Sequence, residues 1–429
     1  MIALLGCAWI DAREALLPYD RDQDGIPWQQ DCDDQDPGPC PYDSAGTFID
    51  YPDTPSDTGT VFDPGNLPVG AVLRSAAAND AFGAAISAGE DVTHDGVPDL
   101  LIGAPGTGQA WFVERVWTAD NYVGNIGVVL GSGGDCGAAV LLAPDVDGDS
   151  LGEALVACPS ANVVERWWPG GDRRGTWLLP AAPRALAGVG PKMFIGVPDL
   201  GVVFGVPVGA YGEVDLADGI SGLRLGDAFG AGLVTGDFEG IGAPQLVVLA
   251  PNAHAARVDL FTQPFPMTAL DAAGTIALGA KDDLVLASAG DVDGDGVGDL
   301  VVGEPNVGTV SFFRAPRGED GRVDAIGTYA GPGEGFGATV AGPGDVDGDG
   351  WDDLIVGDPA YREGAGGLWV LHGPIGVGAV DAYYGPEGAA VGTSLAGTGD
   401  RDQDGLPDVV VAGRDGEHGK IWLLGGGSL

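Results

Sequence analysis

Basic residues are scarce in this sequence, and their scarcity limits the partners that the protein can bind. The 429 residues include 19 Lys plus Arg against 63 Asp plus Glu, for a formal net charge of −44 at pH 7. So negative a chain repels nucleic acids and anionic membranes, and both are excluded as partners. The same charge opposes a compact fold unless bound cations neutralise part of it.

Long apolar stretches and catalytic side-chain patterns are also lacking. The longest apolar stretch, residues 1–10, is too short to cross a bilayer. No His/Cys metal spacing and no glycine-rich phosphate loop occurs. Residues 85–89 come nearest to a nucleophile elbow, but they lack its first glycine and lie on a predicted strand. Paired carboxylates for glycoside hydrolysis stay an alternative, yet metal ligation explains most acidic residues, so we expect a protein that is not an enzyme.

Glycine and proline are plentiful, with 77 and 31 residues. Both interrupt helices and supply turns, so this composition favours many short strands over long helices. Apolar residues make up 45% of the chain, which is enough to fill a core. The composition therefore predicts a folded, β-rich protein.

The five cysteines divide into two pairs and one single residue. Cys32 and Cys40 lie close together in a loop-rich segment, and Cys136 and Cys158 flank two predicted antiparallel strands. These pairs leave Cys7 without a partner. We interpret them as two disulfides of an exported protein, with five free thiols as the alternative.

An acidic motif recurs along the chain, and its interval sets the predicted architecture. The steps between the first residues of successive copies are 54, 92, 54, 54 and 55 residues. One step is nearly double, and Gly196-Val197-Pro198 inside it repeats a Gly-x-Pro signal that follows other copies. A unit without an acidic loop is therefore hidden there, and the units number seven. The visible copies are residues 91–99, 145–153, 237–245, 291–299, 345–353 and 400–408.

Each unit of about fifty residues has the pattern of four strands. In one unit these strands are residues 336–341, 354–356, 367–371 and 379–384. Four antiparallel strands repeated radially predict an all-β fold, a seven-bladed β-propeller of four-stranded antiparallel blades with calcium-binding hairpin loops. A linear β-solenoid is the alternative, but solenoid repeats are much shorter.

Three Phe-Gly pairs, Phe82-Gly83, Phe229-Gly230 and Phe336-Gly337, accompany the acidic loops and the Gly-x-Pro signals. With these features, residues 69–429 resemble the FG-GAP family, whose repeats build the propeller of integrin α-subunits. The resemblance implies calcium loops at one face and ligand binding at the other, through the second-to-third and fourth-to-first strand connections. Aromatic candidates for that face, each of which can also be strand packing, are Trp117, Tyr122, Tyr361, Tyr383 and Tyr384.

The acidic loops have the composition of calcium sites. Calcium prefers roughly six to eight oxygen ligands in flexible geometry. In residues 291–299, the first, third and fifth residues are aspartates, Gly296 permits a sharp turn, Val297 offers its carbonyl and Asp299 closes the site. The twelfth positions are apolar strand residues, so the loops are not EF-hands. The alternative is a solvated acidic turn, in which the like charges would repel one another.

Five of the loops are predicted to bind calcium. In the first, Thr93 replaces an aspartate, and in the second, Ser150 replaces the turn glycine. The loop that begins at Asp237 lacks carboxylates at its fifth and ninth positions, so we expect no site there. The predicted ligands are Asp91, Thr93, Asp95, Val97 and Asp99; Asp145, Asp147, Asp149, Leu151 and Glu153; Asp291, Asp293, Asp295, Val297 and Asp299; Asp345, Asp347, Asp349, Trp351 and Asp353; and Asp400, Asp402, Asp404, Leu406 and Asp408.

A different acidic segment, residues 20–40, precedes the repeats. It resembles the Asp-Cys-Asp-Asp metal-binding segments of secreted bacterial proteins and thrombospondin type 3 loops. That resemblance implies a sixth calcium site, at Asp20, Asp22, Asp24 and Asp31. The predicted organisation is an N-terminal segment with a signal remnant (1–19), this metal-binding loop (20–40), a Pro/Asp/Thr-rich linker (41–68) and the propeller (69–429).

The sequence Leu4-Leu5-Gly6-Cys7 resembles the lipobox of bacterial lipoproteins, which implies a lipid anchor on Cys7. A normal signal has basic residues and a longer apolar segment before it, so the given start is truncated or the match is coincidental. We expect a secreted or cell-surface protein, as a bacterial outer-membrane lipoprotein would be. Its expected function is calcium-stabilised binding or adhesion to a protein or glycan, with a structural surface scaffold or a propeller hydrolase as alternatives.

Overall fold

The computed structural model divides the chain into two compact units, Met1–Thr58 and Gly59–Leu429. It describes residues 60–61, 71–114, 120–145, 150–189, 192–207, 212–213, 219–221, 228–262, 272–281, 283–314, 325–376 and 378–429, all in the second unit. The predicted N-terminal calcium site, the Cys7 anchor and the Cys32/Cys40 pair lie outside these residues. Across the described ranges, no helix is both long enough and apolar enough to cross a membrane.

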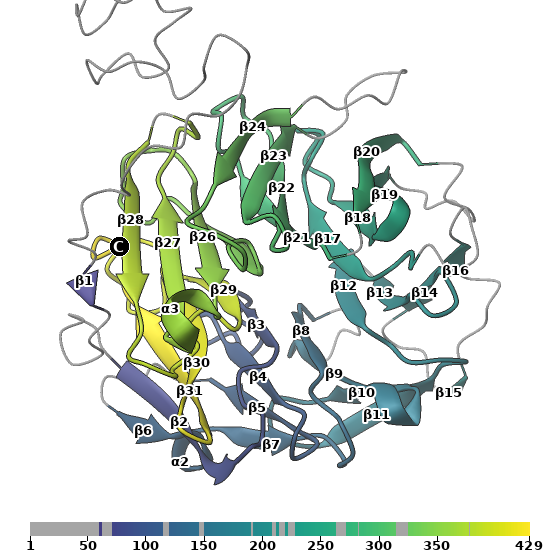
Figure 1. Cartoon of the computed structure of the whole chain (residues 1–429). Helices are drawn as coiled ribbons and strands as arrows, with labels where there is room; N and C mark the ends of the chain where they lie inside the picture. Colours follow the sequence, from purple (N-terminus) through teal and green to yellow (C-terminus); the bar gives the residue numbers. More distant parts are fainter. Residues whose placement is uncertain are drawn as a thin grey trace, which may run out of the picture. The chain divides into compact units, whose positions relative to one another are not determined.

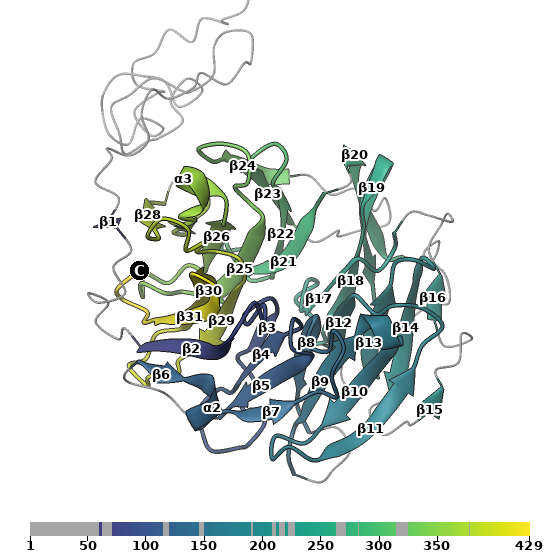
Figure 2. The ribbon, with the colours of Figure 1, turned by 60° about the horizontal axis from the view of Figure 1, so that its bottom comes forward.

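The described residues form seven antiparallel sheets of at least four strands around a ring (Figures 1 and 2). The predicted seven-bladed β-propeller is therefore confirmed. Blades 1 to 3 are β3 (Ile86–Ala88), β4 (Leu100–Ala104), β5 (Gln109–Val113) and β7 (Val128–Leu130); β8 (Ala139–Ala143), β9 (Glu153–Cys158), β10 (Val163–Trp167) and β11 (Arg173–Leu178); and β12 (Ala185–Val189), β13 (Lys192–Val197), β14 (Val202–Pro207) and β16 (Gly219–Ser221).

Blades 4 to 7 repeat the order. They are β17 (Gly232–Gly236), β18 (Gln245–Ala250), β19 (Asn252–Phe261) and β20 (Gly274–Lys281); β21 (Val285–Gly290), β22 (Asp299–Glu304), β23 (Thr309–Arg314) and β24 (Ala325–Ala330); β25 (Thr339–Gly344), β26 (Asp353–Asp358), β27 (Gly367–Leu371) and β28 (Val380–Tyr384); and β29 (Leu395–Gly399), β30 (Asp408–Asp415), β31 (His418–Leu424) and β2 (Ala71–Ala78).

Short elements border these blades. Three two-residue strands add parallel edges: β1 (Thr60–Val61) beside β28, β6 (Asn121–Tyr122) beside β2, and β15 (Gly212–Glu213) beside β11. The described helices are single turns in connections: α2 (Val123–Ile126), the 3₁₀ turn η1 (Pro159–Ala161) and α3 (Tyr361–Gly364).

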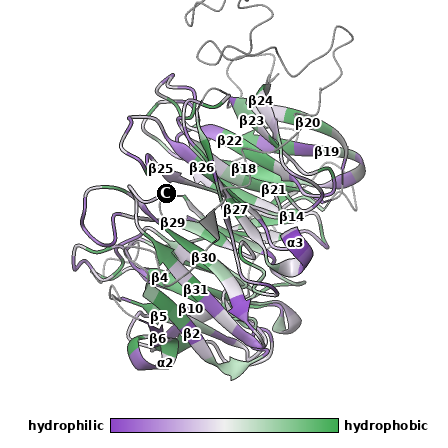
Figure 3. Ribbon diagram, turned by 60° about the vertical axis from the view of Figure 1, so that its left-hand side comes forward, coloured by the Kyte–Doolittle hydropathy of each residue, from purple (hydrophilic) through white to green (hydrophobic). Residues whose placement is uncertain are grey.

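The core lies between the blades. Every residue of β9, β18, β22 and β26, second strands of their blades, is buried. A strand covered on both faces is expected to be apolar at its centre, and the central residues of these four strands are apolar. Figure 3 colours the labelled strands among them, β18, β22 and β26, by hydropathy. The innermost strands β3, β8, β12, β17, β21, β25 and β29 each contact the next, and β29 contacts β3, so the ring closes.

The Phe-Gly and Gly-x-Pro signals meet where two blades touch. A side-chain carbon added to Gly103 of blade 1 would lie 2.0 Å from the carbonyl oxygen of Gly137 of blade 2. The same contact joins Gly303 to Gly337, at 2.2 Å. Gly337 also has a positive φ of 87°, which favours glycine. These glycines are therefore required for the close approach of neighbouring blades.

Blade 3 is the hidden unit. Val189 at the end of β12 pairs directly with Lys192 at the start of β13. Only two residues therefore separate these strands, and the long first-to-second connection of the other blades is missing here. This loss explains why the sequence shows a repeat with no acidic loop.

Blade 7 combines both ends of the propeller. Its outermost strand, β2, pairs antiparallel with β31. In addition, the buried guanidinium of Arg401 donates hydrogen bonds to the backbone carbonyl oxygens of Pro98 and Val113 in blade 1. The ring of blades is therefore closed by a strand pairing within blade 7 and by hydrogen bonds from blade 7 to blade 1.

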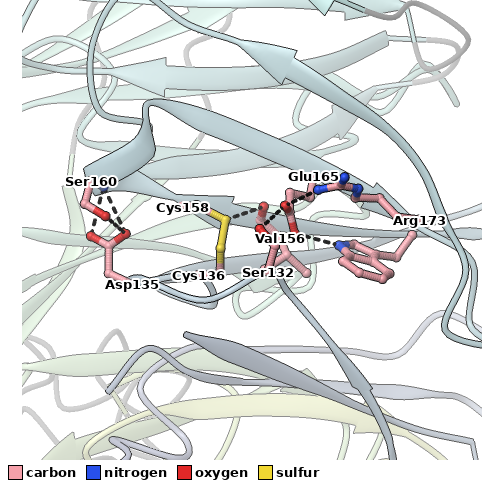
Figure 4. Close-up of a disulfide and its surroundings, with 9 residues drawn as sticks. Ser132, Asp135, Cys136, Val156, Cys158, Ser160, Glu165 and Arg173 are labelled. Atoms are coloured by element: carbon pink, nitrogen blue, oxygen red, sulfur yellow. Dashed lines mark hydrogen bonds and ion pairs between the residues drawn. A yellow bond between two sulfur atoms is a disulfide. The ribbon is translucent and has the colours of Figure 1, made fainter. Parts of the chain in front are cut away.

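A disulfide joins Cys136 to Cys158 in blade 2, as predicted (Figure 4). Cys136 precedes Gly137, so it stands where other blades carry the buried phenylalanine of the Phe-Gly pair. Beside it, Asp135 accepts hydrogen bonds from the backbone N–H and the hydroxyl of Ser160. A covalent bond thus takes the place of an aromatic contact in this blade.

Strand β2 provides a test of the closure. A variant lacking residues 1–68 keeps β2 and should melt as a stable propeller. A variant lacking residues 1–78 loses the buried side chains of Val72 and Leu73, each worth about 1.5–3 kcal/mol, and exposes the edge of β31. We expect a lower Tm for the second variant by calorimetry. Equal Tm values would contradict closure through β2.

Candidate metal centres

The acidic loops occupy equivalent places in six blades. Each connects the innermost strand of its blade to the second strand, as residues 291–298 connect β21 to β22. Since the blades repeat one strand order, all six loops lie at the same end of the ring. Blade 3, in which only two residues separate the first and second strands, has none.

A shared set of backbone hydrogen bonds shapes the loops. In all six, the first aspartate accepts a hydrogen bond from the backbone N–H of the sixth residue, at 2.7–3.0 Å. The sixth residue has a positive φ in every loop, and Ser150 adopts it at 74° in place of glycine. The sixth residues are Gly96, Ser150, Gly242, Gly296, Gly350 and Gly405.

The three intact loops bring carboxylates together. In each, ligand oxygens of the first, third and fifth residues lie within 4.8 Å of one another. The carboxylate of the fifth residue also accepts a hydrogen bond from the seventh N–H, as Asp295 does from Val297 at 3.0 Å. The three groups are Asp291, Asp293 and Asp295; Asp345, Asp347 and Asp349; and Asp400, Asp402 and Asp404.

Two of these carboxylates have buried oxygens that the protein leaves unsatisfied. Oδ1 of Asp291 and Oδ1 of Asp400 are buried and have no hydrogen-bond partner among the described residues. Burying a charged oxygen without a partner is costly, and a bound cation removes that cost. The donor set is all oxygen, which suits a calcium ion. The residues present therefore fit the cation that the sequence predicts.

The side chain of the ninth residue holds its loop by accepting backbone hydrogen bonds. The buried carboxylate of Asp353 accepts hydrogen bonds from the backbone N–H groups of Val346, at 2.7 Å, and Gly373, at 2.9 Å. Asp99, Asp299 and Asp408 accept the same bond from the second loop residue. Gln245 does so through its amide oxygen, from Phe238 at 2.6 Å. The ninth side chain thus fixes the loop whether or not it carries a charge.

The remaining loops differ at their third and fifth positions. Thr93 donates its hydroxyl hydrogen to Asp99, at 3.2 Å. In the second loop, Asp147 and Asp149 lie outside the described residues. In the degenerate loop, both oxygens of Asp237 accept backbone hydrogen bonds, chiefly from Gly242, and these lower the pKa of its carboxyl. Protein N–H groups therefore satisfy Asp237 in a loop that has no carboxylate at its fifth or ninth position.

Burial and repulsion disturb the ionisation of the ninth residues. Burial, with the nearby charge of Asp293, raises the pKa of Asp299 to about 7. Burial also raises the pKa values of Asp99 and Asp408 to about 6. These carboxyls are harder to ionise in the absence of a cation, which is the expected behaviour of ligands held close together.

Two basic side chains face the loops, and sequence reasoning did not assign them. Arg314 pairs across the sheet with Asp299 and forms an ion pair with Asp293, with Asp295 at 3.8 Å. His372 directly follows β27, and its Nδ1 lies 3.1 Å from Oδ2 of Asp347 and 3.6 Å from Oδ1 of Asp353. Both residues lie opposite the ninth loop residue. The only indication of these two residues is their position at the end of the third strand, and it can be interpreted only when the pairing of that strand with the second strand is known.

His372 is strongly affected by its acidic neighbours. The carboxylates of Asp353, Asp381 and Asp347 raise the pKa of its imidazole to about 9, against the opposing effect of burial. Without a metal ion, His372 is therefore a cation at neutral pH. A proton and a metal ion would compete for the same side chain.

The aromatic candidates for the ligand-binding face are either exposed to solvent or packed against other side chains. Tyr122 is 52% exposed on β6. Tyr361, in α3 between the second and third strands of blade 6, stacks on Tyr384 with ring centroids 5.3 Å apart. The exposed Arg362 lies 4.1 Å above the Tyr384 ring. Tyr383 is half-buried, and Trp117 lies outside the described residues.

Comparison with known proteins agrees with this geometry. The FG-GAP repeat matches residues 82–113, 285–325 and 336–371, which lie in blades 1, 5 and 6. Integrin alpha-X of Homo sapiens is 32% identical over 203 residues, covering 43% of this chain and 17% of that protein. Integrin alpha-3 of Mus musculus is 30% identical over 135 residues, covering 29% and 13%. Integrin alpha-7 of Mus musculus is 37% identical over 109 residues, covering 22% and 9%.

The matches therefore span less than a fifth of the length of each of these relatives. Together with the seven blades, they support an FG-GAP, integrin-like β-propeller. The FG-GAP matches lie within residues 82–371, so the acidic segment of residues 20–40 is outside them.

The raised carboxyl pKa values predict how the metal-free protein responds to pH. The folded pKa of Asp299, about 7, exceeds the ordinary value of 3.8, so the native state binds more protons than the unfolded chain between these values. Stability should therefore fall as the pH rises through that interval. We expect the Tm of chelator-treated protein to decrease from about pH 5 to about pH 8. Asp299→Asn, which keeps an acceptor for Val292, should flatten this decrease; a Tm that rises over the interval would contradict the assignment.

Proposed function

We propose that this propeller is a calcium-stabilised binding module of the extracellular space or cell surface, and that it is not an enzyme. The observation that carries the proposal is the recurrence of three carboxylates on one loop geometry in blades 5, 6 and 7, with buried unsatisfied oxygens at Asp291 and Asp400. The similarity to integrin alpha chains supports the adhesive or binding role. The disulfide in blade 2 is typical of exported proteins.

In each proposed site, the first, third and fifth side chains would hold the ion, and the seventh residue would add its carbonyl. Blades 1 and 2 would supply two further sites, and residues 20–40 a sixth. Six calcium ions would change the net charge from −44 to −32. Because the folded loops preorganise the carboxylates, calcium would bind the native state preferentially. Each site at a hundredfold excess over its Kd would contribute about 2.7 kcal/mol.

The end of the ring opposite the calcium loops would bind the ligand, a protein or a glycan. The second-to-third connection of blade 6 is the best-defined candidate there. Arg362 and Glu363 have positive φ values of 47° and 60°, which non-glycine residues rarely adopt. Such backbone strain is frequently found in binding segments. The exposed guanidinium of Arg362 is also one of the few basic groups on an acidic protein.

The protein would be held at the cell surface through Cys7, if its lipobox-like sequence is processed. A structural surface scaffold without a specific ligand is the second candidate function. Both functions use the same calcium-stabilised propeller, so ligand binding separates them.

Calcium stoichiometry tests the metal sites. Asp291→Ala should remove one bound ion and lower the Tm, because Asp291 offers an unsatisfied oxygen in a group of three carboxylates. Asp237→Ala is the matched control, since both aspartates accept a hydrogen bond from the sixth loop N–H, at 2.8 and 2.7 Å. The control should lose hydrogen bonds but no ion. Native mass spectrometry counts the ions, and equal counts in both variants would contradict the blade 5 site.

Ligand binding is tested with a glycan array and a panel of extracellular matrix proteins, with calcium and with a chelator. We expect binding that requires calcium and that Arg362→Ala reduces by roughly tenfold, the loss of a single good polar anchor. Arg174→Ala, which removes an exposed arginine from the outer strand β11, is the control. Calcium-independent behaviour, or no binding to any probe, would favour the scaffold.

A further inference from the structure

His372 sits among three carboxylates in blade 6. Its side chain is 6% exposed. Nδ1 lies 3.1 Å from Oδ2 of Asp347 and 3.6 Å from Oδ1 of Asp353, while Nε2 lies 3.2 Å from Oδ2 of Asp381. The two ring nitrogens thus face different acidic partners, one on the loop side and one on β28.

The contact to Asp381 orients the ring as in many metal sites. Nε2–H can donate to Asp381, and a histidine that binds a metal commonly donates its other N–H to a carboxylate. Such a donation leaves Nδ1 as a neutral electron-pair donor. Nδ1 is buried and makes no hydrogen bond among the described residues, although two carboxylate oxygens lie near it. A cation between these three atoms would satisfy Nδ1, while Oδ1 of Asp353 would keep its hydrogen bond from the N–H of Gly373.

The donor set differs from that of the calcium loops. Ligand atoms of Asp347, Asp353 and His372 lie within 4.8 Å of one another. One imidazole nitrogen with two carboxylate oxygens suits zinc and similar divalent ions, whereas calcium prefers oxygen alone. Three protein ligands with one open position are common in zinc sites. A cavity of about 190 Å³, lined by His372, Tyr329 and Phe312, lies beside the imidazole of His372. It can admit a water molecule or a small ligand as the fourth donor.

Blade 6 alone offers a histidine at this place among the described blades. The residue opposite the ninth loop position follows or ends the third strand in each blade. In the other blades with acidic loops it is Glu114, Trp168, Thr262, Arg314 and Gly425. The site is therefore a specialisation of one repeat, and the general loop pattern does not account for it.

We propose that His372, Asp347 and Asp353 form a binding site for one zinc-class divalent ion, with Asp381 as the positioning residue for His372. Asp347 also belongs to the carboxylate group of the proposed blade 6 calcium site. One of its oxygens accepts the backbone N–H of Asp349, at 3.0 Å, and the other faces His372. The site does not require calcium to be bound, and it can be tested with and without it.

The test is metal binding by the full chain at about pH 7.5, where an incoming zinc ion must displace the proton that the acidic neighbours of His372 favour on its imidazole. Protein stripped with chelator is titrated with zinc alone, and with cobalt(II) as a spectroscopic substitute. The wild type should bind one more zinc ion than His372→Asn and give a cobalt absorption that the variant lacks. Asp381→Asn, which keeps His372, should weaken zinc binding by roughly 10- to 100-fold.

His418→Asn is the matched control, because His418 is exposed at the start of β31, and it should bind zinc as the wild type does. Cys7, Cys32 and Cys40 are present in every variant, so any zinc that they bind cancels in the comparison. Calcium counts on the same variants report failure of the proposed calcium sites separately. Equal zinc stoichiometry and affinity in the wild type, His372→Asn and Asp381→Asn would overturn the zinc site.

Discussion

One hydrogen bond, from the second N–H of the loop to the side chain of the ninth residue, anchors five of the six acidic loops to the sheet. That side chain is buried at the start of the second strand, so it ties the loop to the most buried strand of its blade. In blade 4, the neutral amide of Gln245 makes the bond as well as Asp353 does in blade 6. The shape of the loop is therefore separable from its charge. Protein hydrogen bonds and left-handed residues set the fold, and the carboxylates at the third and fifth positions decide whether a cation can be held.

Most of the fold was predictable because its signals are periodic or local. The interval of the acidic motif predicted seven units, and the structure has seven blades. The pairing of Cys136 with Cys158 followed from two adjacent antiparallel strands. Within the loops, the first, third and fifth aspartates were expected to lie close together, because residues so close in sequence cannot separate far in space, and their carboxylates do lie together.

The parts that were missed depend on contacts across the sheet. Arg314 and His372 reach the loops only through the register of the third strand against the second, and nothing near them in sequence indicates that register. The ninth residues were predicted as metal ligands alone, because sequence gives no measure of the backbone N–H groups that surround a buried carboxylate. Even so, Cys136 follows Phe82 by the repeat interval of 54 residues, so its place in the Phe-Gly position was visible.

The loops also differ in how far basic side chains of the protein offset the repulsion between their carboxylates. Arg314 supplies a positive charge to the loop of blade 5, and His372 does so in blade 6 when it is protonated. Arg401 lies between the acidic loops of blades 7 and 1, where Asp408 and Asp99 favour its charge although burial lowers its pKa to about 10. No arginine or histidine stands at the third-strand position of blade 7, where the residue is Gly425. Arg401 is a single charge shared between Asp99 of one loop and Asp408 of the other, so it balances the two carboxylates only in part. A cation of the kind proposed for the acidic loops would offset the rest of this charge, at the place where the ring closes.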